Sequence, residues 1–261
     1  INQYMKSRSL ELEGVSVKVE TTAQIRLTRS RNVLGFFEGS DPALQGEVVV
    51  LGAHLDHLGK RGDYIFNGAD DNGSGCAALL EVARAFAANG MRPKRSILFA
   101  FWTGEEEGLL GSRYYADHPR VPMSRTVACL NLDMVGRTWN AERLKRTAAQ
   151  WGVDLPEDAL PKIQADRFLV LPLSEDPAVA DAMREADRHV GLSLFLRPTK
   201  SGGGGSDHTP FALRGIPWIF FFGSMHEDYH GPADTVDKVS LRQVADVARL
   251  AYLAAFQLAD K

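Results

Sequence analysis

Val48–Gly52 reads V-V-V-L-G, Ser96–Trp102 reads S-I-L-F-A-F-W, and Thr126–Leu132 reads T-V-A-C-L-N-L. Each stretch is a nearly continuous apolar run, which is typical of a strand in a sheet that is covered on both faces. Between the first two runs, Gly73–Asn89 carries apolar residues at the spacing of an amphipathic helix. Strands that alternate with helices predict an α/β fold with a mostly parallel, mixed central sheet and helices on both faces.

Apolar periodicity predicts further elements on either side of this core. They are strands at Asn32–Glu38, Ser193–Arg197 and Pro217–Phe222, and helices at Leu109–Asp117, Pro177–Val190, His208–Arg214 and Leu241–Leu258. The length of 261 residues and the lack of an internal repeat favour a single domain over residues 1–261.

Three segments fall outside this pattern. Val15–Thr28 alternates apolar and polar residues and predicts a β-hairpin, so we expect residues 1–31 to pack as an extension of the core. Residues 138–166 are more polar, contain proline and lack an apolar strand run, which indicates an insertion. Ser201–Ser206 (S-G-G-G-G-S) is a flexible stretch that we interpret as a natural glycine-rich loop.

The bulk composition argues against several classes of partner. The formal net charge is −3, with 30 basic and 33 acidic residues, so we do not expect nucleic-acid binding. No stretch reaches the ~18 apolar residues of a membrane span. Cys76 and Cys129 lie in apolar stretches and are expected to be free, buried thiols. Because the chain starts at Ile1 rather than Met, we expect a segment upstream of it.

Five residues with metal-binding side chains follow apolar runs or lie in glycine-rich turns, where a strand end can present them. They are His54, Asp71, Glu106, Asp133 and His230. Two histidines and three carboxylates exceed the need of one catalytic zinc ion, which takes three protein ligands and a water. The set is about right for two ions that share a carboxylate and a water. In open α/β sheets, such ligands gather at the carboxyl ends of the strands.

Neighbouring acidic residues add to this pattern, although each has a simpler interpretation. Asp56 lies two residues after His54, so in an extended segment both would point the same way and Asp56 could orient the histidine. Asp70 and Asp71 could instead cap the helix that follows them. Glu105–Glu107 are three adjacent carboxylates, which require a cation or full exposure, and one could bind metal while the preceding one reaches a metal-bound water.

Other chemistries find little support in the sequence. There is no G-x-S-x-G nucleophile elbow, no phosphate-binding glycine loop and no H-E-x-x-H zinc signature. A calcium-dependent structural domain is an alternative for the acidic loops. The two histidines favour zinc, because calcium prefers oxygen ligands.

Six motifs occur in an order and spacing that resemble one known family. They are A-H-L-D-H-L-G (Ala53–Gly59), G-A-D-D-N-G-S-G (Gly68–Gly75), G-E-E-E-G-L-L-G-S (Gly104–Ser112), N-L-D-M-V-G (Asn131–Gly136), S-D-H-T-P-F (Ser206–Phe211) and Y-H-G-P-A-D-T (Tyr229–Thr235). Together they resemble the two-zinc exopeptidases that include aminopeptidase Y and the secreted bacterial leucyl aminopeptidases. The resemblance runs from about Asn32 to Val239 and implies the phosphorylase/hydrolase-like α/β fold of those enzymes.

The resemblance implies two zinc ions per chain. One ion would take His54, Asp71 and Asp133. The other would take Asp71, Glu106 and His230, so that Asp71 bridges the two.

The resemblance also implies roles for residues outside the ligand set. Glu105 would be the general base, and Asp56 would orient the first histidine. Tyr229 matches a tyrosine that stabilises the oxyanion in some members of the family. Asp207 and His208 match a motif beside the substrate pocket and are not expected to be ligands.

The implied activity is that of a zinc-dependent aminopeptidase acting on peptides with a free N-terminus. A carboxypeptidase or a dipeptidase of the same family is an alternative, and so is a non-catalytic metal-binding or receptor-like domain. A glutaminyl cyclase would use one zinc, which the complete ligand set argues against. No arginine is identifiable as a clamp for a terminal carboxylate, which favours the amino end. Relatives are mostly secreted, periplasmic or vacuolar, so we expect a secreted or periplasmic protein.

Overall fold

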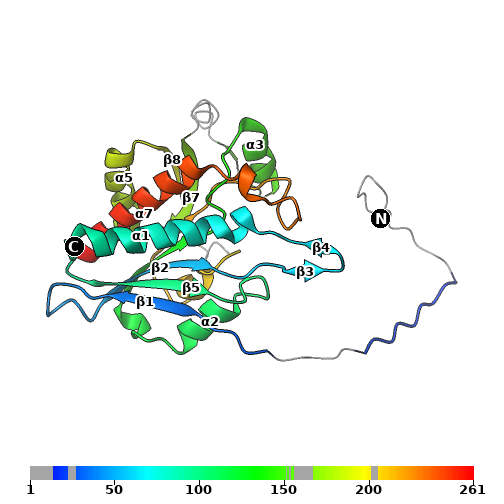
Figure 1. The fold of residues 1–261 in the computed structure, drawn as a ribbon, viewed down its shortest axis with the longest axis horizontal. Helices are drawn as coiled ribbons and strands as arrows, with labels where there is room; N and C mark the ends of the chain where they lie inside the picture. Colours follow the sequence, from blue (N-terminus) through cyan, green and yellow to red (C-terminus); the bar gives the residue numbers. More distant parts are fainter. Residues whose placement is uncertain (1–13, 23–27, 151, 153, 156–166, 201–204) are drawn as a thin grey trace.

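The computed structural model describes residues 14–22, 28–150, 152, 154–155, 167–200 and 205–261. A seven-stranded sheet forms its centre (Figure 1). In spatial order its strands are β1 (Val33–Phe37), β5 (Ser96–Trp102), β2 (Val48–His54), β6 (Thr126–Leu132), β9 (Trp218–Phe221), β7 (Phe168–Ser174) and β8 (Ser193–Thr199). The four strands β5, β2, β6 and β9 are mutually parallel, whereas β1 and the β7–β9 pair are antiparallel. The predicted mostly parallel, mixed α/β sheet is therefore confirmed.

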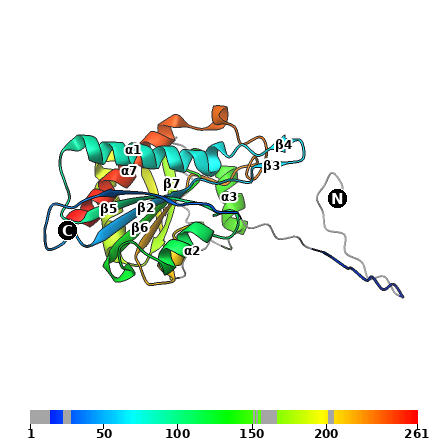
Figure 2. The same ribbon diagram turned by 60° about the horizontal axis from the view of Figure 1, so that its bottom comes forward.

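Helices cover both faces of this sheet. Three helices pack against one another on one face: α1 (Gly75–Asn89), α5 (Pro177–Val190) and α7 (Leu241–Asp260). The opposite face carries α2 (Leu110–Asp117) and α6 (Thr209–Ala212). Figure 2 shows α1 and α7 on one side of the strands and α2 on the other. A further helix, α3 (Ala141–Gln150), lies outside these two layers, and the small hairpin of β3 (Lys60–Arg61) and β4 (Tyr64–Ile65) extends from the sheet edge.

Alternation along the central strands divides the core in two, because successive side chains of a strand point to opposite faces. In β2, Val49 and Leu51 pack with α1 and α7, whereas Val48 and Val50 face α2 and α6. Both sets are fully buried. This explains why the strands read as continuous apolar runs, since both faces of the sheet are covered.

Most of the predicted elements are present with ends that agree within a few residues. The sequence did not predict β3, β4, α3 or β7, and of these only β7 belongs to the central sheet. Its sequence, F-L-V-L-P-L-S, contains Pro172, and proline is depleted from strand interiors because it cannot donate a ladder hydrogen bond. The structure accommodates Pro172 in register with Arg197 of β8. Pairing with β9 is limited to Leu173–Ile219 and an isolated bridge from Val170.

The hairpin predicted over Val15–Thr28 is wrong for the part of it that the structure describes. Residues 14–22 form no strand, and the side chain of Val17 is 79% exposed. Figure 1 shows this segment away from the sheet. An isolated hairpin is marginal in water, and no described strand lies beside residues 14–22 to stabilise one. Residues 23–27, which include part of the predicted hairpin, lie outside the described part of the chain.

The predicted insertion, residues 138–166, begins against the core and not away from it. Trp139 and Leu144 are buried, and the Trp139 ring packs against Phe222 beyond β9. Residues 156–166 lie outside the described part. That the whole of residues 1–261 forms one domain stays a prediction.

A glycine in β2 allows close packing next to the strand end that carries His54. A Cβ added at Gly52 would overlap the Trp102 indole of β5. We expect Gly52→Ala to lower the free energy of unfolding by about 1–3 kcal/mol, because the rigid ring has to move. Urea unfolding followed by circular dichroism measures this change.

Gly35 in the neighbouring strand β1 provides a matched control. A Cβ there would lie 3.8 Å from its nearest neighbours on Phe99, an ordinary contact. Gly35→Ala should leave stability unchanged or raise it by up to ~1 kcal/mol, since alanine loses less backbone entropy on folding. Equal losses in the two variants would contradict the packing argument.

Candidate active site and metal centre

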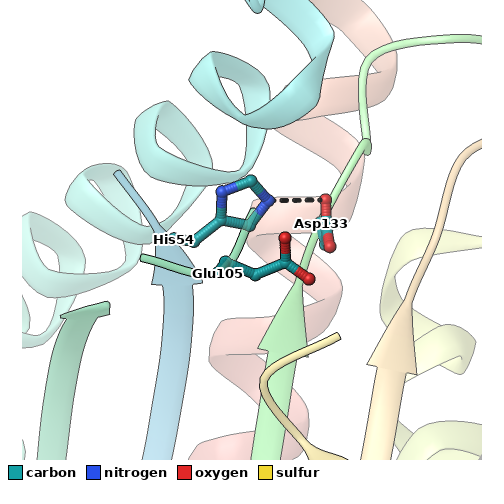
Figure 3. A group of neighbouring side chains, drawn as sticks. All are labelled: His54, Glu105 and Asp133. Carbon is teal, nitrogen blue, oxygen red and sulfur yellow. Dashed lines mark hydrogen bonds and ion pairs between the residues drawn. The ribbon is translucent and has the colours of Figure 1, made fainter. Parts of the chain in front are cut away.

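The carboxyl ends of three neighbouring parallel strands place polar side chains at one edge of the sheet. His54 is the last residue of β2, Asp133 follows the end of β6, and Glu105 lies in the turn after β5. Because parallel strands end on the same side, these residues meet although they are far apart in sequence. Figure 3 shows the His54 ring directed at Asp133, with the Glu105 carboxylate beside them.

Asp71 lies between two groups of side chains. Its Oδ1 is 3.3 Å from Nε2 of His54, which is also 3.3 Å from Oδ1 of Asp133. Its Oδ2 is 3.3 Å from Nε2 of His230, which is 3.1 Å from Oε2 of Glu106. The structure therefore brings together all five predicted ligands, with the two oxygens of Asp71 facing separate groups.

The spacing and chemistry of these atoms fit zinc. Two ligands that are each ~2.0–2.1 Å from one ion at the tetrahedral angle lie about 3.3–3.4 Å from each other. Nitrogen and oxygen donors are those that zinc takes. Glu106 Oε1 is buried, with Nδ1 of His57 2.7 Å away.

A second histidine enters one of the two groups. In the described part of the chain, two sets of residues offer ligand atoms within 4.8 Å of one another. They are His54, Glu105 and Asp133, and His57, Asp71 and Glu106. The sequence did not predict a role for His57, although it lies in the same motif as His54.

The turn before α1 aims Asp71 at the site and its neighbour away from it. Oδ2 of Asp234 accepts hydrogen bonds from the backbone N–H groups of Asp70 and Asp71, at 2.9 and 3.1 Å. Oδ1 of Asp70 instead accepts from the N–H of Gly136 at 2.6 Å and from the hydroxyl of Ser74 at 2.9 Å. Asp70 is therefore a structural residue, and Asp234 holds the turn that presents Asp71.

Asp56 acts through different atoms from those expected. The backbone carbonyl of Asp56 is 3.0 Å from Nδ1 of His54, whereas its carboxylate is 3.9 Å from that nitrogen. The carboxylate accepts hydrogen bonds from the N–H groups of Glu105 and Glu106, at 3.1 and 3.3 Å. Asp56 thus fixes the tautomer of the histidine by its main chain and positions both glutamates by its side chain.

Ser206, at the end of the glycine-rich loop, contacts a predicted ligand that the sequence did not connect to it. Its hydroxyl donates to Oδ2 of Asp133 at 2.6 Å and accepts from Nδ2 of Asn131 at 2.7 Å. Oδ1 of Asp133 is left facing His54. The only signal in the sequence was the adjacent motif S-D-H-T-P-F. Residues 201–204 lie outside the described part.

Burial and mutual repulsion shift the proton equilibria of the site. Burial, reinforced by the charge of Asp133, raises the pKa of Glu105 to about 9. Burial also raises the pKa of Asp71, with the charge of Asp133 adding to it. Burial disfavours charge on His54, but the carboxylate of Asp133 outweighs this and raises the pKa of the imidazole. Four carboxylates crowded at one place are an environment that a divalent cation would stabilise.

Tyr229 and His230 come from the loop after β9. Their rings stack with centroids 3.8 Å apart, and His230 has a left-handed backbone with φ of 53°. Such a conformation is uncommon outside glycine and is found at functional sites. Burial and the nearby carboxylates raise the pKa of Tyr229, so its hydroxyl keeps its proton and can donate a hydrogen bond.

Asp207 and His208 lie behind the site in the core. The His208 ring stacks against Trp218 and Phe220, with centroid distances of 4.4 and 4.8 Å. Asp207 is fully buried. Burial, with the charges of Asp133 and Asp56 adding to it, raises the pKa of Asp207 from 3.8 to about 7.

Paired histidine–carboxylate groups at the edge of an α/β sheet define the class of metal-dependent hydrolases. Within that class, the chain belongs to peptidase family M28, which matches residues 32–255. The family resemblance seen in the motifs is thereby confirmed.

Individual relatives are similar at moderate identity. Leupeptin-inactivating enzyme 1 of Streptomyces exfoliatus is 28% identical over 215 residues, covering 82% of this chain and 40% of the relative. A glutamate carboxypeptidase 2 homolog of Caenorhabditis elegans is 27% identical over 224 residues, covering 80% of this chain and 26% of the relative. The solved structure of BSAP, a zinc aminopeptidase from Bacillus subtilis, is 26% identical with a TM-score of 0.65. The match covers 88% of this chain and 50% of that structure's chain. The chain thus spans half or less of the length of these relatives.

The buried carboxyl of Asp207 predicts a pH dependence of stability. Its pKa is higher in the folded chain than the 3.8 of the free group, so between pH 4 and 7 the folded state binds more protons than the unfolded state. Stability contributed by the neutral carboxyl is therefore lost as pH rises through this window. In the metal-free protein, Asp207→Asn should gain stability relative to wild type between pH 4 and 8, by roughly 4 kcal/mol at most.

Thermal or urea unfolding at a series of pH values measures this difference. Asp63→Asn, which changes an exposed carboxylate, is the control and should follow the wild-type profile. A constant difference between Asp207→Asn and wild type across pH 4–8 would show that Asp207 does not titrate in this way.

Proposed function

We propose that this chain carries the catalytic site of a zinc-dependent aminopeptidase, which holds two zinc ions and hydrolyses the N-terminal peptide bond of peptides. The observation that supports this most is the placement of Asp71, whose two carboxylate oxygens face two separate histidine–carboxylate groups. Membership of peptidase family M28 and the likeness to a zinc aminopeptidase support the same class of reaction.

The residues at hand would hold the two ions in distinct groups. His54, Asp71 and Asp133 would hold one, and Asp71, Glu106 and His230 the other. When bound, zinc lowers the pKa of a coordinated water to ~7 and polarises a carbonyl oxygen. Proton transfer and stabilisation of the oxyanion would be carried out by side chains of this protein.

Glu105 is placed to move the proton. Its carboxylate lies with His54 and Asp133 at the site and is not used in the pairs around Asp71. Cations bound beside Glu105 would lower the pKa of its carboxyl and leave it ionised. We infer that the carboxylate then accepts the proton of the attacking water and passes it to the leaving amine, in the manner of a general acid–base group. The N–H bonds from the Glu105–Glu106 turn to Asp56 hold it in position. Tyr229 would donate a hydrogen bond to the developing oxyanion.

The choice of the amino end rests on the surroundings of the site. Among the described residues, Arg137 is the only buried arginine, and its guanidinium pairs with Asp228 and contacts His226. It is therefore not free to bind a terminal carboxylate. A carboxypeptidase stays the second candidate, because one relative is named as a glutamate carboxypeptidase homolog. A dipeptidase is a third.

A non-catalytic, receptor-like role is disfavoured by the completeness of the site. All five ligand-type residues converge, and the carboxylate of Glu105 stands beside them. In the described part of the chain no helix is long and apolar enough to cross a membrane. Secretion or export to the periplasm stays a prediction.

Replacing Glu105 tests the proposed proton transfer. Glu105→Gln preserves the shape of the side chain but removes the basic carboxylate, so kcat should fall by about 10²–10⁴-fold while zinc content stays at the wild-type level. Steady-state kinetics on a leucyl-anilide, with zinc measured on the same sample, provide both values. Glu107→Gln, at an exposed neighbouring position, is the matched control and should retain full activity.

Substrates with blocked ends decide which terminus is recognised. A free peptide and its C-terminally amidated form should be cleaved at similar rates, whereas the N-acetylated peptide should resist cleavage. Removal of metal by a chelator should abolish cleavage of all three, and added zinc should restore it. Equal cleavage of the N-acetylated peptide excludes an aminopeptidase, and resistance of the amidated peptide would indicate a carboxypeptidase.

A further inference from the structure

A buried network of charged and polar side chains lies beside the loop after β9, which carries Tyr229 and His230. Its central member is Arg137, a buried residue in the segment that follows β6. Nη2 of Arg137 donates a hydrogen bond to Oδ2 of Asp228 and lies 3.3 Å from Nδ1 of His226. A guanidinium is always charged and can only donate, so both loop residues must accept from it.

The network extends from these two contacts in both directions. Because Nδ1 of His226 accepts from Arg137, the proton of the neutral imidazole lies on Nε2, which is 3.3 Å from Oδ2 of Asp70. On the other side, Nζ of Lys238 donates to Oδ1 of Asp228 at 2.8 Å. The network therefore connects the loop after β9 to the turn before α1 that contains Asp70.

The loop is anchored on both sides of His230. Before His230, Asp228 accepts from Arg137. After His230, Asp234 accepts from two N–H groups of the turn before α1. The left-handed backbone of His230, with φ of 53°, is a conformation that persists only where the surrounding structure imposes it. Loss of one anchor would let His230 relax away from its position 3.3 Å from Oδ2 of Asp71.

We propose that Arg137 is a positioning residue of the metal centre, which holds the loop after β9 so that His230 stays within reach of the second ion. The inference rests on the two-ion site of the proposed function and deepens it. Arg137 acts through Asp228 and His226, so its contribution is to the geometry of one ligand. Loss of its side chain should therefore weaken binding of the second ion far more than binding of the first.

The ligands that only the first ion uses are fixed independently of the Arg137 side chain. His54 is the last residue of β2, within the sheet. The backbone N–H of Asp133 donates to the carbonyl of Phe221 in β9 at 3.1 Å. The side-chain amide of Gln243 donates to the backbone carbonyl of Arg137 at 2.8 Å and holds the segment after β6 by its main chain. A change of the Arg137 side chain leaves these main-chain contacts in place.

The neighbouring residue of the loop provides a matched control. Glu227 accepts two hydrogen bonds from Nη2 of Arg143, each 3.0 Å long. The side chain of Glu227 is 61% exposed, whereas that of Asp228 is 11% exposed. Exposed ion pairs contribute little, because water screens them, whereas removal of one member of a buried pair leaves the other charge unpaired. Only the Arg137 pair should therefore move His230.

Zinc binding tests the role of Arg137 without relying on activity. Arg137→Met removes the charge and keeps an unbranched side chain, and Arg143→Met makes the same change at the control pair. His230→Ala identifies which of the two dissociation constants belongs to the second ion. Each purified protein is stripped with a chelator and titrated with zinc against a competing chelator, and bound zinc per chain is counted by mass spectrometry.

Wild type and Arg143→Met should bind two zinc ions with the same two dissociation constants. In Arg137→Met, the constant of the second ion should rise at least about tenfold more than that of the first, which is the lower end of the loss caused by residues that orient a metal ligand. A smaller difference between the two ions overturns the proposal, because a general loss of structure would weaken both alike. The same selective loss in Arg143→Met would overturn it too, since any contact with the loop would then be sufficient.

Circular dichroism of the metal-free proteins checks that each variant folds. If Arg137→Met does not fold, Asp228→Asn decides the question by the same criterion. Asp228→Asn keeps the shape of the side chain that Arg137 binds and removes its charge.

Failure of this inference is distinguishable from failure of the proposed function. A wild-type protein that binds two zinc ions, without a selective loss of the second in Arg137→Met, overturns the role of Arg137 alone. A wild-type protein that binds fewer than two zinc ions overturns the two-ion site and the role of Arg137 together. The same holds if His230→Ala weakens neither ion.

Discussion

One buried carboxylate organises the site: the two oxygens of Asp71 face in two directions, each 3.3 Å from a different histidine. A carboxylate in this position is unfavourable alone, because burial and the neighbouring Asp133 both oppose its charge. The chain holds it there by anchoring the backbone, with Asp234 accepting two N–H groups of the turn. Gathering carboxylates lowers the stability of the folded state. Cations that bind to the folded state would raise its stability again.

The sheet makes this gathering possible. Parallel strands β2, β5 and β6 end at one edge of the sheet. His54, Glu105 and Asp133 therefore lie close together although they are far apart in the sequence. Helices on both faces bury the strands. Side chains outside the ligand set then orient it: Ser206 holds one oxygen of Asp133, and Asp56 holds the turn of the two glutamates.

The sequence predicted the parts of the molecule in which local pattern and tertiary packing agree. Doubly covered strands such as β5 and β6 are nearly continuous apolar runs, and their ends were predicted to the residue. β7 escaped prediction because Pro172 argues against a central strand, and tertiary pairing with β8 overrides that preference. The hairpin at Val15–Thr28 had the right alternation but no partner surface in the described residues. At the site, the motifs pointed to the five residues that the structure brings together. Which atoms of Asp56, Ser206 and Asp234 support them depends on contacts between distant segments, which spacing in the sequence does not encode.

Diffraction from zinc-loaded crystals, recorded at the zinc absorption edge, tests the central claim most directly. The account predicts two anomalous peaks ~3.5–4 Å apart, one beside each oxygen of Asp71. A single peak, or a pair of peaks located away from Asp71, would contradict it.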